Sequence, residues 1–179
     1  MLIYMVTLQR PIDVARAKRS HFNFETKMWS IPDDETKTDV WYFIPLSDVA
    51  IVLIQHAFRL TESEYLFPSD RAKAPHMDEA GMTQNWARYR RALLKAGKIP
   101  DPDIELYDCR RFGRTQIQYK PKFDARVAEA VINHAPSKSM ATRYDVRDLG
   151  PDVRLALQGW GTEVLTMVGI DISVLEDIT

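Results

Sequence analysis

The sequence predicts a mainly helical domain with one small antiparallel β-hairpin or sheet, an α+β fold. Apolar residues recur at helical spacing in most segments after residue 47. Strand-like runs are few: residues 28–31 and 40–44 combine β-branched and aromatic residues around a polar turn, which is typical of a hairpin. A chain of 179 residues is long enough for one domain with a sizeable core.

The first part of the chain is expected to hold three helices and the hairpin. Residues 1–9 are predicted to end one helix, and Pro11 suits the first position of a second helix over residues 11–19. Polar residues 33–36 are predicted to form the hairpin turn. Ser47 is a suitable N-cap for the helix that follows, whose apolar run predicts burial.

The later part is expected to be helical throughout, after a loop over residues 67–81 that is rich in Pro, Asp and Ala. Gly97 and Asp124 mark a helix end and a helix start, respectively. The expected helices cover residues 83–96, 106–119, 124–134 and 151–168, with a short one around Tyr144.

Composition restricts the compartment and the class of protein. No apolar run approaches the roughly 20 residues that a membrane span needs, and the start of the chain lacks the features of a signal peptide. A single cysteine, Cys109, is consistent with a reducing cytoplasm. The net charge of −1 is lower than usual for nucleic-acid binding, but basic residues cluster locally, at residues 88–98 and 110–122. We therefore expect a cytoplasmic protein without a membrane partner.

Several residue types in the chain suit phosphodiester cleavage without a metal. Such a reaction needs cations on the non-bridging oxygens, a nucleophile and an acid for the leaving oxygen. The guanidinium fork of arginine meets phosphate oxygens bidentately, and Arg10 and Arg110 are candidates that only folding could bring together. The sequence has neither a Gly-rich phosphate loop nor Cys/His metal-ligand spacing, so no metal or cofactor is expected.

Short motifs in a fixed order carry a family resemblance. They are Gln9-Arg10-Pro11, Lys37 before Pro45-Leu46-Ser47, Phe67-Pro68-Ser69, Tyr107-Asp108-Cys109-Arg110-Arg111, Asn133-His134 and Tyr144. Each motif is degenerate by itself, but the ordered set is fairly specific. Over about residues 2–165 the chain resembles the catalytic domain of the tyrosine recombinases, the phage-type integrases.

The resemblance implies a bacterial or phage-encoded recombinase that cleaves and rejoins DNA through a 3′-phosphotyrosyl link, without metal or ATP. Tyr144 would attack the phosphate, Arg10 and Arg110 would hold it, Lys37 would protonate the leaving oxygen, and His134 would hydrogen-bond the phosphate. Tyr107 completes the implied catalytic set. The helix over residues 83–96 would lie on a double-stranded DNA attachment site, with Gln84, Asn85 and Arg88 as contacts, and the protein would self-associate there.

Three features depart from the family pattern. One is Asp13, a shorter side chain than the acidic residue that usually follows the first arginine by three positions. Tyr107 stands where the family's box has a histidine, and a phenol is a poor base at neutral pH. Family members also carry an N-terminal domain before the first catalytic arginine, whereas Arg10 lies almost at the start of this sequence. We therefore expect residues 1–168 to be an isolated catalytic domain. The tail, residues 169–179, is expected either to dock on a neighbouring protomer or to pack on its own domain.

Three alternatives remain open at this point. A catalytically decayed DNA-binding domain of the same fold would explain Tyr107 and the low net charge. A type IB topoisomerase-like enzyme would share the chemistry, although the Phe-Pro-Ser and Asn-His segments are more similar to integrases. A helical interaction domain with no DNA role would lack salt-dependent DNA binding.

Overall fold

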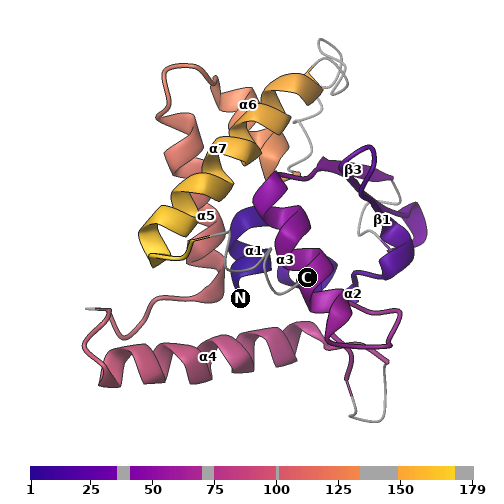
Figure 1. Ribbon diagram of the computed structural model, residues 1–179. Helices are drawn as coiled ribbons and strands as arrows, with labels where there is room; N and C mark the ends of the chain where they lie inside the picture. Colours follow the sequence, from indigo (N-terminus) through magenta and orange to yellow (C-terminus); the bar gives the residue numbers. More distant parts are fainter. Residues whose placement is uncertain (36–40, 70–74, 100, 134–148, 172–179) are drawn as a thin grey trace.

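The computed structural model describes residues 1–35, 41–69, 75–99, 101–133 and 149–171. Most of these residues are helical, and a small sheet lies beside the helices at one side of the molecule (Figure 1). The α-helices are α1 (Leu2–Thr7), α2 (Pro11–Arg16), α3 (Asp48–Arg59), α4 (Glu79–Lys95), α5 (Leu106–Gln118), α6 (Ala125–Val131) and α7 (Gly150–Val168). Across the described ranges, none of these helices is both long and apolar enough to cross a bilayer.

The sheet has three antiparallel strands in the order β1 (Phe22–Asn23), β2 (Met28–Ile31) and β3 (Tyr42–Pro45). Trp29 of β2 pairs with Ile44 of β3, which places both buried side chains on the same face of the sheet. The predicted hairpin is therefore present, and the short strand β1 is an addition that the sequence pattern did not indicate. The segment between β2 and β3 includes residues 36–40, which lie outside the described part.

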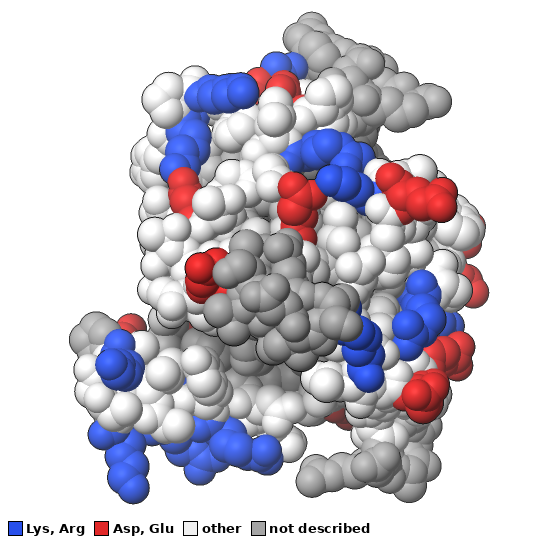
Figure 2. Space-filling view, viewed as in Figure 1, with Lys and Arg blue, Asp and Glu red and all other residues white. Residues whose placement is uncertain are grey.

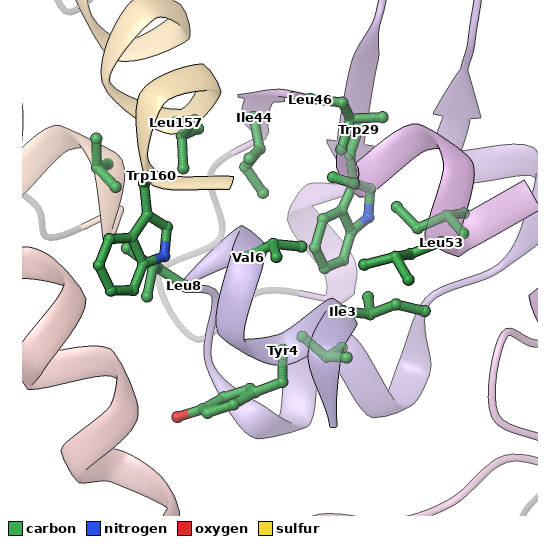
Figure 3. Packing of buried hydrophobic residues seen from close by; sticks show 14 of the residues in the cluster. Ile3, Tyr4, Val6, Leu8, Trp29, Ile44, Leu46, Leu53, Leu157 and Trp160 are labelled. Atoms are coloured by element: carbon green, nitrogen blue, oxygen red, sulfur yellow. The ribbon is translucent and has the colours of Figure 1, made fainter. Parts of the chain in front are cut away.

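The core is built around the short helix α1, which contacts α3, α5 and α7. Figure 3 shows Val6 of α1 between Trp29 and Trp160, with Leu8 against Trp160. The indole of Trp160 donates a hydrogen bond to the carbonyl of Met5 (2.8 Å), so the side chain of α7 also ties down the backbone of α1. This burial fixes the end of α1, from which the candidate site begins.

Side-chain caps set the starts of three helices. The hydroxyl of Ser47 accepts a hydrogen bond from the Ala50 amide (3.1 Å), and the carboxylate of Asp124 accepts from the amides of Arg126 and Val127, as predicted. Asp78 accepts from the Gly81 amide (2.6 Å) and starts α4 at Glu79. The prediction that residues up to 81 form a loop and that the helix starts at 83 was wrong for this reason.

The helix α2 ends at Arg16, earlier than the predicted residue 19. The backbone groups of residues 17–19 form hydrogen bonds with residues 64–66 instead. The Leu66 amide donates to the carbonyl of Ala17 (2.7 Å), and the Arg19 amide donates to the carbonyl of Glu64 (2.7 Å). Pairing with this segment holds the chain extended and prevents the helix from continuing.

Candidate active site

Arg10 lies at the N-terminus of α2, immediately after the core helix α1. Its backbone is extended (φ −63°, ψ 147°), and Pro11 takes the first helical position because its missing N–H is not needed there. Nη2 of Arg10 donates to the carbonyl of Asn133 (3.4 Å), and Nη1 lies 3.8 Å from Oδ2 of Asp13. Arg10 therefore connects the start of α2 with the segment after α6.

Arg110 is buried in α5, with 6% of its surface exposed. Its two Nη groups donate hydrogen bonds to the carbonyls of Leu8 and Ile132. These two residues are the C-caps of α1 and α6, where backbone carbonyls have no partner within their own helix and a cation is favoured. Burial, reinforced by the charge of Arg10, lowers the pKa of the Arg110 guanidinium to about 10, so it remains charged near neutral pH.

Tyr107 lies one turn before Arg110 on α5 and is 38% exposed. Its hydroxyl donates to Oε1 of Glu79, the first residue of α4 (3.3 Å). Burial raises the pKa of the Tyr107 phenol, the carboxylate of Glu79 raises it further, and the charges of Arg110 and Arg10 oppose the rise. The phenol is therefore neutral and hydrogen-bonded in the free protein.

These side chains line one pocket of about 390 Å³ at the surface. Its lining consists of Arg10, Tyr107, Arg110, Arg111, Arg114, Glu129 and Ile132. Arg111 is paired with Asp108 (3.0 Å), and Nε of Arg114 is paired with Glu129 (2.7 Å). The pocket still carries more positive than negative charge, which suits an anion with several oxygens such as a phosphate diester.

The structure brings three of the six sequence-predicted catalytic residues, Arg10, Tyr107 and Arg110, to this pocket. The other three, Lys37, His134 and Tyr144, lie outside the described residues.

The predicted DNA contacts lie on α4. Gln84 and Arg88 are exposed, whereas Asn85 is half-buried and its amide donates to Sδ of Met77 (3.4 Å). Figure 2 shows Lys and Arg side chains along the lower edge of the molecule, where Figure 1 places α4. Arg91 and Lys95 of α4 are exposed as well. The outer face of this helix is therefore basic despite the low net charge of the chain.

Sequence reasoning missed two residues that shape the site. Gln9 is fully buried, and its amide donates to the carbonyls of Thr7 (2.8 Å) and Val131 (2.9 Å), which joins the ends of α1 and α6. The sequence prediction places Glu79 in a loop, although Asp78 followed by a glutamate is a recognisable helix start. No sequence signal connects Glu79 with Tyr107, which lies 28 residues later.

Comparison with known proteins adds a sequence relative. No protein-family model matches the chain. The prophage integrase IntA of Escherichia coli (strain K12) is 26% identical over 157 residues. That alignment covers 87% of this chain and 36% of the relative, so the chain spans about a third of the length of that protein.

Two solved structures are similar in three dimensions. The integrase from mycobacterium phage Brujita matches with a TM-score of 0.62 and 15% identity, over 88% of this chain and 49% of that one. The XerA recombinase matches with a TM-score of 0.56 and 15% identity, over 94% of this chain and 55% of that one. Together with the sequence relative, these matches show that the chain has the tyrosine recombinase/integrase fold, that of the catalytic domain.

Proposed function

We propose that this chain is the catalytic domain, over residues 1–168, of a cytoplasmic site-specific DNA recombinase of the integrase type. The observation that carries the proposal is the convergence of Arg10 and Arg110 on one pocket, although 100 residues separate them in the sequence. This convergence occurs in a chain with the recombinase fold. The substrate in this proposal is a double-stranded DNA attachment site.

Arg110 can bind a phosphate without giving up its structural contacts. A guanidinium has five N–H donors, and the carbonyls of Leu8 and Ile132 take two of them. Within the described part of the chain no further acceptor binds this guanidinium, which leaves three donors for an anion in the pocket that Arg110 lines. Arg10 is more exposed, with 29% of its side chain accessible, and its distances to Asn133 and Asp13 are long. We assign both arginines to the non-bridging oxygens, whose charge grows in the transition state.

The remaining roles follow the family resemblance. Tyr144 attacks the scissile phosphate to form a 3′-phosphotyrosyl link, Lys37 protonates the leaving 5′ oxygen, and His134 hydrogen-bonds the phosphate. Tyrosine has an ordinary pKa of about 10, so ionising it near neutral pH costs about 4 kcal/mol, which charge-assisted hydrogen bonds can offset. The covalent link keeps the bond energy, so rejoining requires no ATP, and the proposed chemistry uses no metal.

Binding of the substrate in this proposal uses α4. Gln84, Asn85 and Arg88 contact the DNA, and the basic outer face of the helix favours the phosphate backbone. The proposed enzyme self-associates on its site, with the tail of residues 169–179 docking on a neighbouring protomer.

The test is covalent trapping on nicked duplexes that carry candidate attachment sites. A denaturant-resistant protein–DNA adduct is expected from the wild type and from Tyr119→Phe, a control at a tyrosine that is 80% exposed. Tyr144→Phe is expected to abolish the adduct. An adduct that persists in Tyr144→Phe would move the nucleophile elsewhere. Salt-sensitive DNA binding without any adduct would instead indicate a DNA-binding domain that has lost turnover.

A further inference from the structure

The contact between Tyr107 and Glu79 joins α5 to the first turn of α4 beside the arginine pocket. The Tyr107 hydroxyl donates to Oε1 of Glu79 over 3.3 Å, which is long for an O–H···O hydrogen bond. Such contacts in the free state of an enzyme commonly tighten when substrate binds. Among the described residues that line the pocket, Tyr107 is present and Glu79 is absent, so Glu79 reaches the pocket through the phenol.

The charges around the phenol come from several elements. Glu79 approaches from α4, Arg10 from the start of α2, and Arg110 from α5. The ring of Tyr4, on α1, lies near enough to interact electrostatically with Tyr107 as well. The carboxylate and the two guanidiniums therefore act on the phenol with opposite signs.

This arrangement addresses a chemical problem that Tyr107 creates. A hydroxyl that attacks phosphorus must lose its proton, and a lone phenol cannot hold a second proton at neutral pH. A phenol that is hydrogen-bonded to a carboxylate can accept a proton on its oxygen as its own proton moves on. The phenol and the carboxylate together can then accept the proton of the attacking hydroxyl, as a single basic side chain would.

We infer that Glu79 is a positioning residue that, through its hydrogen bond with Tyr107, makes the phenol a proton acceptor for the reaction in this pocket. The inference rests on the proposed function. It adds a carboxylate on α4 to the residues expected from the family resemblance. It also explains how Tyr107, which stands where the family has a histidine, could accept a proton.

The attacking hydroxyl gives its proton to the oxygen of Tyr107, while the original phenol proton passes to Oε1 of Glu79. The attacking oxygen bonds to phosphorus, and the bond from phosphorus to the leaving 5′ oxygen breaks. The leaving oxygen keeps the electron pair and takes a proton from the general acid. Glu79 ends neutral, and it returns its proton by the same route when the strand is rejoined.

The experiment measures two quantities for each variant: the single-turnover rate of adduct formation on a saturating nicked duplex, and the affinity for that duplex. Glu79→Gln keeps the shape of the side chain and a hydrogen-bond acceptor but removes the base. We expect it to slow adduct formation about a hundredfold, the low end for general acid–base catalysis, without weakening DNA affinity. Glu62→Gln, at an exposed glutamate, makes the same charge change and should leave the rate unaltered.

Two variants of Tyr107, each combined with Glu79→Gln, separate a chemical role of Glu79 from a structural one. In Tyr107→Phe the relay is already broken, so adding Glu79→Gln should cause no further loss of rate. In Tyr107→His the ring supplies its own base, so the rate should recover and should no longer depend on Glu79. Additive losses in the Phe background, or a loss of affinity that accounts for the loss of rate, would overturn the inference.

The two proposals fail in different ways. A wild-type rate in Glu79→Gln, with an adduct still forming, would overturn the role of Glu79 and leave the recombinase proposal standing. A wild-type protein that forms no adduct on any duplex would overturn both.

Discussion

Arg110 donates a hydrogen bond to the carbonyl of Leu8, 102 residues earlier in the chain. The same guanidinium donates to Ile132, so one buried cation holds the C-terminal ends of α1 and α6 against α5. The residue proposed to grip the phosphate is thus also part of the scaffold. Folding of the core and assembly of the candidate site are therefore coupled at this side chain.

This coupling predicts that Arg110→Lys lowers stability as well as activity. A lysine keeps the charge but has no fork, so it cannot reproduce both hydrogen bonds in the same geometry. An unpaired buried carbonyl costs about 1–3 kcal/mol, and we expect the free energy of unfolding in urea to fall by that amount. Arg111→Lys is the matched control, because Arg111 is exposed and should change stability by less than about 0.5 kcal/mol. Equal stabilities for the two variants would contradict the scaffold role.

The close packing of α5 on Leu8 predicts a second loss of stability. A Cβ added at Gly113 would lie 2.5 Å from Cδ2 of Leu8 and 3.0 Å from Cζ2 of Trp160. Leu8 is fully buried and cannot swing away, so Gly113→Ala should lower the free energy of unfolding by about 1–3 kcal/mol. A Cβ added at Gly159 in α7 meets no described residue within 4 Å, so Gly159→Ala should raise stability by up to about 1 kcal/mol through helix propensity. Thermal unfolding of both variants checks the opposite signs.

The sequence predicted those elements whose signals are local. Ser47 and Asp124 cap their helices through amides two or three residues away, so a short window of sequence contains the whole interaction. The end of α2 could not be predicted in this way. Hydrogen bonds between residues 17–19 and residues 64–66 end it, and no residue near Arg16 in the sequence indicates that pairing.

The same distinction applies to the candidate site. The motifs around Arg10, Tyr107 and Arg110 indicated which side chains to consider, through the family resemblance. The partners of those side chains, the carbonyls of Leu8 and Ile132 and the carboxylate of Glu79, depend on contacts across 22 to 102 residues. Only the folded chain reveals them, and they determine what each side chain still has free for a ligand.

His21 provides a prediction about pH. The ring is buried, its Nδ1 accepts from the Lys18 amide (3.3 Å), and Nε2 lies 3.6 Å from Oε1 of Glu35. Burial is the main cause that lowers the pKa of His21, and Lys18 adds to it, while Glu35, Asp34 and Glu64 oppose it. The folded protein therefore takes up this proton at a lower pH than the unfolded chain does.

The sign follows from proton linkage. As pH falls below about 6.5, the unfolded chain protonates its histidine first, so the contribution of His21 is complete above that pH and decreases below it. We expect the wild type to lose more free energy of unfolding between pH 7.5 and 5.5 than His21→Asn, whose side-chain oxygen can still accept from Lys18. Urea titrations at both pH values measure the difference. A larger loss in the variant would show that the neighbouring carboxylates outweigh burial.

The basic face of α4 predicts a salt dependence for DNA binding. If Arg88 neutralises a phosphate, that contact releases counterions when DNA binds. Each such contact makes the slope of log K against log salt concentration steeper by about 0.9. Arg88→Gln should therefore make the slope shallower by roughly that amount and weaken binding similarly on all sequences. A contact with a base edge would instead weaken binding selectively at one position of the site.

The control for this experiment is Arg126→Gln, which makes the same change in net charge on α6, where Arg126 is paired with Asp124. Fluorescence titrations of a labelled duplex across a range of salt concentrations give both slopes. If the two variants shift the slope equally, the effect comes from the overall charge of the protein, and α4 has no special role. If only Arg88→Gln shifts it, the exposed outer face of α4 lies against the backbone. Because Glu79 begins this same helix beside Tyr107, DNA bound along α4 would then pass next to the arginine pocket.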